Sequence, residues 1–191
     1  NDPSLLEMFK TYSTNEKKIY IMAHFNHSRE LTPEAIEGLN LLMKSGVTMV
    51  NQTPLVAGVN DDPEVLTELF NKLSYIGVPP YYVFLCRPTL GNETYSVSVE
   101  RGYEIFEKAR TLCSGLAKRA RLVMSHESGK IEVVGMTEDQ IFFKYARAAE
   151  NNNNARFMAF YRNPKACWFD DYKEASEEFS LFSETTKAGC L

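Results

Sequence analysis

Side chains able to do chemistry gather at a few points of the sequence, each directly after a short apolar run. His24 closes the first run, the amides Asn51 and Gln52 follow the second, and Arg87 follows the third. His24 suits hydrogen bonding to a polar ligand, or a structural role at a strand end. The two amides suit a nucleoside or amino-acid ligand, although strand-end amides also fasten loops. Arg87 offers a rigid fork to a carboxylate or phosphate, or else forms a salt bridge with an acid such as Glu93.

Lys130 is the sharpest candidate for covalent chemistry. It follows Ser128 and Gly129 on a loop that enters a predicted strand. A lysine amine withdrawn from water can lose its proton and attack a carbonyl carbon, as Schiff-base chemistry requires. Most lysines are instead solvated surface charges, so the residues alone leave both interpretations open.

Metal binding is disfavoured. His24 and His27 are three residues apart, and the alternation of strand side chains points them to opposite faces. The cysteines are too widely spaced for a C-x2-C or C-x3-C-x2-C ligand cluster, and we interpret them as reduced, small apolar residues: Cys86, Cys113, Cys167 and Cys190.

Hydrophobic periodicity predicts the elements that position these side chains. Residues 18–24 read as a buried strand, and a helix follows, with Thr32 as its N-cap and Gly46 at its end. The unit recurs twice, with strands over 47–50 and 81–85, a loop over 53–60, and helices that begin at Asp62 and Val99. Successive strand–helix units imply a parallel sheet with right-handed crossovers. We therefore predict an α/β fold, a partial (βα) barrel with parallel strands, whose ligands bind beyond the carboxyl ends of the strands.

The last third changes character. Short strand-like segments divided by Gly, Asp and Asn predict a small antiparallel β extension: 121–125, 130–134, 140–145 and 156–161. We expect a barrel portion over 1–120, the extension over 121–172 and a tail over 173–191.

The composition of the chain limits the classes of molecule that it is expected to bind. The formal net charge is −4, and no basic stripe is present, which argues against nucleic acid. No apolar run is long enough to cross a bilayer, so we expect a cytoplasmic protein without a membrane partner. An open sheet edge would favour a homo-oligomer. Because the chain begins with Asn1, we expect it to be a piece of a longer protein.

Four ordered motifs carry a resemblance to a known family. They are His24-Phe25-Asn26-His27, then Asn51-Gln52-Thr53-Pro54-Leu55 leading to Gly58-Val59-Asn60-Asp61, then Pro80-Tyr81-Tyr82 ending in Cys86, then Ser114-Gly115-Leu116-Ala117. In order and spacing they resemble the lysine 2,3-aminomutase (KamA) family of radical S-adenosylmethionine enzymes, over the chain as far as about residue 135.

The resemblance implies an enzyme fragment that works with S-adenosylmethionine, pyridoxal phosphate and a [4Fe–4S] cluster. Members of the family generate a 5′-deoxyadenosyl radical and move an amino group between adjacent carbons of an amino-acid substrate. It places His24 and Gln52 near S-adenosylmethionine, with Asn51 as a further neighbour. It also places Lys130 where the family has its pyridoxal-phosphate lysine.

Departures from the family pattern carry information of their own. The cluster motif C-x3-C-x2-C is absent, so this chain alone should lack the cluster and be inactive. Two aspartates that bind the distal ammonium in the lysine enzymes are Arg87 and Val123 here. A cation at that place repels an ammonium and attracts an anion, so we predict a substrate other than lysine, such as an acidic amino acid. The family's zinc-binding cysteine is Asp62, so no zinc is expected.

Two other classes of function remain open on the sequence. One is a non-catalytic barrel module that binds a nucleotide or an amino acid. The other is a metal-dependent barrel hydrolase that uses His24 and Asp61. A C-x3-C-x2-C motif in the preceding sequence of the parent protein would favour the radical enzyme over the binding module.

Overall fold

One seven-stranded sheet runs through the computed structural model, which describes residues 2–173. The strands follow one another across the sheet in chain order: β1 (Tyr20–Ala23), β2 (Thr48–Leu55), β3 (Pro80–Leu85), β4 (Arg121–His126), β5 (Gly129–Met136), β6 (Gln140–Ala148) and β7 (Phe157–Tyr161). The pairs from β1 to β4 are parallel, and those from β4 to β7 are antiparallel. The predicted α/β fold, a partial barrel with an antiparallel extension, is confirmed.

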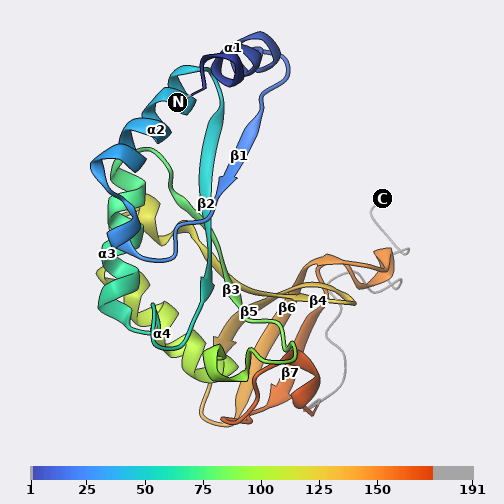
Figure 1. The fold of residues 1–191 in the computed structure, drawn as a ribbon. Helices are drawn as coiled ribbons and strands as arrows, with labels where there is room; N and C mark the ends of the chain where they lie inside the picture. Colours follow the sequence, from blue (N-terminus) through green and yellow to red (C-terminus); the bar gives the residue numbers. More distant parts are fainter. Residues whose placement is uncertain (1, 174–191) are drawn as a thin grey trace.

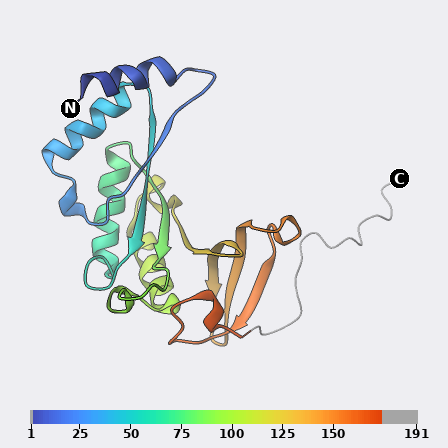
Figure 2. The same cartoon turned by 45° about the vertical axis from the view of Figure 1, so that its right-hand side comes forward.

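Helices cover one face of the parallel strands. The connections carry α2 (Pro33–Lys44), α3 (Pro63–Tyr75) and α4 (Val99–Leu112), which line the outer side of the sheet (Figure 1). In both views the opposite face of β1–β4 carries no helix of the described residues (Figure 2). This bare side is called the open face below. Because α/β sheets normally bury both faces, an uncovered one is suited to a ligand or to the rest of a barrel.

Short 3-10 turns complete the described chain: η1 (Ser28–Glu30), η2 (Glu93–Tyr95), η3 (Leu116–Arg119), η4 (Asn151–Asn153) and η5 (Phe169–Asp171). Cys190 and the predicted tail after Lys173 lie outside the described residues. None of the helices within 2–173 has the length and apolar character needed to cross a membrane.

Helix boundaries follow the predicted signals. The Thr32 hydroxyl accepts a hydrogen bond from the Ala35 amide at 3.2 Å, and the Asp62 carboxylate accepts one from the Glu64 amide at 2.7 Å. Gly46 follows α2 with a φ of +93°, a conformation that favours glycine. An additional helix, α1 (Pro3–Tyr12), was not predicted, although Asp2 caps it and Pro3 opens it in the same way.

The second strand is longer than predicted. It continues through Pro54 to Leu55, so the predicted loop over 53–60 begins three residues too early. Alternate side chains of β2 are buried, including the polar Asn51 and Thr53, and this burial keeps the chain extended. Asn51 and Gln52 therefore lie inside the strand rather than at its carboxyl end.

The main core lies between the helices and the sheet. Leu66, Leu69, Phe70 and Leu73 of α3 are fully buried in it. A second cluster of edge-to-face rings lies in the extension and includes Phe143, Phe160, Phe169 and Tyr172. The two clusters support the two ends of one continuous sheet.

Candidate functional site

Alternation along β3 defines which side chains point to the open face. Val83 and Leu85 are buried against the helices. Tyr82 and Phe84 must then point to the opposite side, because successive strand residues face opposite sides of a sheet. These two rings form an aromatic floor on the open face.

The register of β4 and β5 brings Lys130 to this floor. Phe84 is paired with Val123 in β4, and Ser125, two residues later, is paired with Lys130 in β5. Paired residues share a face, so Lys130 points to the open face. Its Nζ atom lies 4.2 Å from the centre of the Tyr82 ring and 5.2 Å from that of Phe84. The ammonium is therefore held by cation–π contacts with both rings.

His24 and Gln52 meet on the same face. Gln52 is paired with Tyr82 across the β2–β3 ladder, and the His24 Nε2 contacts the Gln52 Nε2. This contact joins the imidazole of His24 to the side-chain amide of Gln52. The structure thus puts His24, Gln52 and Lys130 on one face of one sheet.

Asn51 has a different position from its neighbour Gln52. Its side chain is fully buried on the helix side of β2. The Asn51 Oδ1 accepts from the Phe25 amide at 2.8 Å, and its Nδ2 donates to the Phe25 carbonyl at 3.0 Å and to the Thr53 hydroxyl at 2.8 Å. Asn51 therefore fastens the loop after β1. Its contact with a cofactor stays a prediction that this burial does not support.

Arg87 lies exposed just beyond the carboxyl end of β3. The predicted salt bridge with Glu93 is not formed, since the Glu93 carboxylate accepts instead from the Gly91 amide at 3.1 Å. Within residues 2–173, no carboxylate forms an ion pair with Arg87. As far as residues 2–173 are concerned, the guanidinium is therefore open to an anion.

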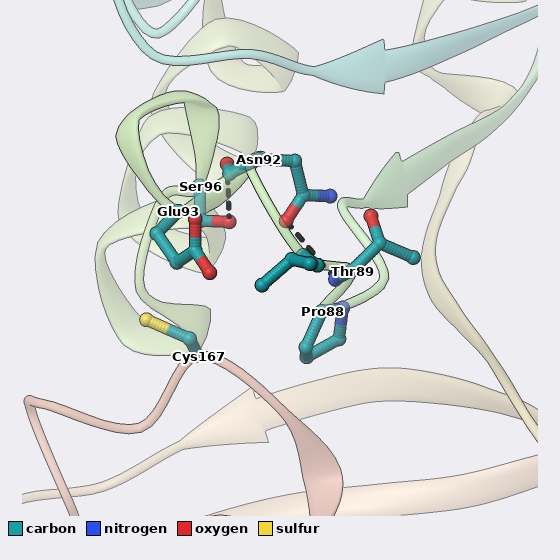
Figure 3. Close-up of a pocket in the computed structure, with 7 residues that line it drawn as sticks. Pro88, Thr89, Asn92, Glu93, Ser96 and Cys167 are labelled. Carbon is teal, nitrogen blue, oxygen red and sulfur yellow. Dashed lines mark hydrogen bonds between the residues drawn. The ribbon is translucent and has the colours of Figure 1, made fainter.

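The loop after Arg87 encloses a hollow of its own. Asn92 holds the loop, because its Oδ1 accepts from the Thr89 amide at 3.1 Å and its carbonyl accepts from the Ser96 hydroxyl at 3.3 Å (Figure 3). A cavity of about 390 Å³ lies beside these residues, with the Cys167 thiol at its rim (Figure 3). None of the predicted site residues lines this cavity.

A polar network beside Lys130 was missed by sequence reasoning. The His126 Nδ1 accepts from the Ser128 amide at 3.1 Å, and its Nε2 lies 3.1 Å from both oxygens of Asp170. The Ser128 hydroxyl lies 2.7 Å from the His126 Nδ1 and 2.8 Å from the Tyr145 hydroxyl. Only His126 and Ser128 are close in sequence, so the pattern offers no signal for Asp170 or Tyr145.

Two groups near the site have shifted pKa values. Burial, followed by a hydrogen bond with Tyr81, raises the pKa of Tyr82 to about 12. Burial also raises the pKa of the Cys86 thiol, which donates to the Leu55 carbonyl at 3.2 Å. Both groups are therefore neutral at physiological pH.

No metal site is apparent in the described part of the chain. Residues 2–173 contain no group of three or more His, Cys, Asp or Glu side chains placed to hold an ion. His27 instead caps η1, where its Nδ1 accepts from the Arg29 amide at 3.1 Å. Asp61 accepts from the Gly58 amide at 2.8 Å and so braces a turn.

Comparisons with known proteins give a consistent assignment. A protein of Aquifex aeolicus named "Putative L-lysine 2,3-aminomutase" is 54% identical over 180 residues, which cover 94% of this chain and 48% of that protein. The L-lysine 2,3-aminomutase of Clostridium subterminale is 41% identical over 59% of this chain and 26% of its own length. The glutamate 2,3-aminomutase of Clostridioides difficile is 37% identical over 58% of this chain and 26% of its own length.

Comparisons with solved structures and with family models give weaker support than these relatives. A radical SAM methyltransferase from Sphaerobacter thermophilus, a solved structure, aligns with a TM-score of 0.45 at 18% identity, covering 64% of this chain and 38% of that one. No family model matches the chain. The chain spans about half the length of the Aquifex relative and about a quarter of the other two. Within that span, the resemblance of this chain to the lysine 2,3-aminomutase family is confirmed.

Proposed function

We propose that this chain is part of a radical S-adenosylmethionine enzyme that uses pyridoxal phosphate to move an amino group between adjacent carbons of an amino acid. The observation that carries the proposal is the common face of His24, Gln52 and Lys130, on a chain 54% identical to a relative named as an aminomutase. These are the residues that the family resemblance assigns to S-adenosylmethionine and pyridoxal phosphate.

The surroundings of Lys130 fit pyridoxal phosphate. Its amine lies over the rings of Tyr82 and Phe84, which offer flat apolar surface to a pyridine ring. It forms no ion pair with any carboxylate of the described residues. If pyridoxal phosphate binds here, the Lys130 amine would be the group that holds the cofactor covalently through its aldehyde carbon. When bound, the cofactor supplies stabilisation of charge and unpaired electron density next to the migrating nitrogen.

His24 and Gln52 suit the polar part of S-adenosylmethionine. One Gln52 N–H is taken by His24, which leaves its carbonyl and its second N–H for a ligand. The second ring nitrogen of His24 is a further polar atom that a ligand could contact. The ligands of the [4Fe–4S] cluster do not lie in these 191 residues, which lack the C-x3-C-x2-C motif.

The substrate that fits this site carries a distal anion. Arg87 presents a guanidinium at the carboxyl end of β3, and no carboxylate of residues 2–173 pairs with it. Val123 is fully buried and offers no charge to balance an ammonium. The glutamate 2,3-aminomutase among the relatives is named for such a substrate. We therefore infer an acidic amino acid rather than lysine.

Borohydride trapping tests the cofactor assignment. The complete protein, with whatever sequence flanks these residues, is incubated with pyridoxal phosphate, reduced and mapped by peptide mass spectrometry. We expect the label on Lys130 and its loss in Lys130→Met. The matched control is Lys144→Met, because Lys144 is paired with Glu132 on the same face of the next strand. Labelling of another lysine in the wild type would refute the assignment.

Turnover with two substrates tests the role of Arg87. The complete enzyme, reconstituted with its cluster and cofactors, should convert glutamate and leave lysine unchanged. Arg87→Gln should raise the KM for glutamate by about tenfold or more, the loss expected for one charge-assisted contact. Turnover of lysine by the wild type, or an unchanged KM in the variant, would contradict the proposed substrate.

A further inference from the structure

A cavity opens beside Lys130 at the end of the β4–β5 hairpin. Its volume is about 370 Å³, and its polar lining consists of Ser125, His126, Lys130 and Arg147, together with a glycine and two alanines. None of the described residues that line it is acidic. Among these described residues, the positive charge of Lys130 and Arg147 is therefore not neutralised within the lining.

The two cations of this cavity face each other across the sheet. Lys130 of β5 is paired with Arg147 of β6. Like charges directly opposite one another in a sheet destabilise it. Within the described residues neither side chain forms an ion pair, and the nearby Glu132 carboxylate is engaged with Arg121, 3.6 Å from its Nη1. An anion between the two cations would remove this repulsion.

The backbone holds this cation pair at close range. Gly129, the residue before Lys130, has a φ of +139°, and a Cβ placed there would lie 2.2 Å from the Arg147 carbonyl oxygen. Only glycine allows the two strands to approach so closely at this point. The pairing of Lys130 with Arg147 is therefore built into the start of β5.

Hydrogen bonds fix the His126 side chain, which forms another part of the cavity wall. The His126 side chain is only 8% exposed and is held at both ring nitrogens, by Ser128 on one side and by Asp170 on the other. Since Nδ1 accepts the Ser128 amide proton, Nε2 carries the hydrogen that is donated to Asp170. The Asp170 carboxylate is thus engaged with the far side of the imidazole and does not line the cavity.

We propose that this cavity binds an oxyanion, a phosphate or a carboxylate group, with the guanidinium of Arg147 as its main ligand and Lys130 beside it. Arg147 offers the planar fork that matches both groups in bidentate fashion. The identity of the natural ligand rests on the proposed function: it is the phosphate of the cofactor or a carboxylate of the amino acid. The site itself depends only on the pairing, the cavity and its charge.

Chemical protection tests the anion site without requiring any reaction at Lys130. Phenylglyoxal modification of Arg147 in the complete protein is followed by peptide mapping, with and without inorganic phosphate. Phosphate should slow modification of Arg147 by about fivefold or more at saturation, the protection expected from a charge-assisted contact. Arg119, an exposed residue of η3 outside the cavity, is the matched control and should not be protected. Equal rates at Arg147, or equal protection at both arginines, would overturn the proposal.

Trapping with paired aldehydes distinguishes the two anions. Pyridoxal phosphate and pyridoxal differ in the phosphate, and glyoxylate and acetaldehyde differ in a carboxylate. Arg147→Gln should raise the half-saturating concentration of one anionic aldehyde at Lys130 by about tenfold, while its neutral counterpart is unaffected. Arg119→Gln should change neither pair. If Arg147→Gln changes neither, the proposal is overturned. If no aldehyde labels Lys130 while phosphate still protects Arg147, the proposed function fails and the anion site stands.

Discussion

Glu100 and Arg162 join the barrel helices to the antiparallel extension. One Glu100 oxygen lies 2.8 Å from the Arg162 Nη2 and 3.0 Å from its Nε, and the other accepts from the Asn163 amide at 2.7 Å. The Glu100 side chain is only 3% exposed. Nearby, the Val99 amide donates to the Ala166 carbonyl at 2.8 Å. Since Glu100 belongs to α4 and Arg162 follows β7, this contact fastens the antiparallel extension, which includes Lys130, to the helix layer of the parallel strands.

Removal of Arg162 should destabilise the protein strongly. Arg162→Ala leaves the Glu100 carboxylate buried without its cation, and we expect the free energy of unfolding to fall by about 3 kcal/mol. Urea denaturation measures this loss. Arg101→Ala on the same helix is the matched control, because its ion pair with Glu104 is exposed and should contribute less than about 1 kcal/mol. Equal losses in the two variants would show that the buried ion pair contributes no more to the free energy of unfolding than the exposed one.

Substitution of Gly129 should disturb the entry to β5. Gly129→Ala introduces a Cβ 2.2 Å from the Arg147 carbonyl oxygen at a φ of +139°, so we expect a loss of about 2 to 4 kcal/mol. Gly58→Ala is the matched control, because it keeps the effect of a positive φ and removes the steric clash. Gly58 has a φ of +75°, but nothing lies within 4 Å of a Cβ added there. It should cost about 1 kcal/mol. Thermal unfolding of both variants separates the steric effect from the effect of φ.

Neighbouring amides should respond differently to the same substitution. Asn51→Leu leaves the Phe25 amide and carbonyl without their side-chain partners, and we expect a loss of about 2 to 4 kcal/mol in unfolding free energy. Gln52→Leu on the open face should change stability by less than about 1 kcal/mol. In the reconstituted enzyme, it should instead weaken binding of S-adenosylmethionine, measured by equilibrium dialysis. A large stability loss in Gln52→Leu would argue for a structural role of both amides.

Sequence patterns predicted the elements of this fold better than the pairings between them. The helix starts were predictable from short stretches of sequence, because an N-cap residue and the first helical turn lie within a few residues of each other. The examples are Thr32 and Asp62, each followed by a proline. The open face follows from alternation once β3 is located. The contacts of His126 with Asp170 and of Glu100 with Arg162 join residues that are 44 and 62 positions apart, and no local pattern records them. The extent of β2 was misjudged because Asn51, Thr53 and Pro54 resemble loop residues, whereas burial of Asn51 and Thr53 on the helix side keeps this segment in the strand.

Titration of Tyr82 reports on the floor beneath Lys130. Its ordinary pKa of 10.0 is raised to about 12, chiefly because burial disfavours the phenolate. The unfolded chain then releases this proton first, so the contribution of Tyr82 to stability is complete below pH 10 and is lost as the pH rises towards 12. The difference in tyrosinate absorbance between the wild type and Tyr82→Phe should have its midpoint near pH 12. Tyr75→Phe is the control, since Tyr75 is 93% exposed, and its removal should leave that late component in place. A midpoint for Tyr82 near its ordinary value would mean that water reaches the phenol, and that the aromatic floor beneath the Lys130 amine is looser than the structure shows.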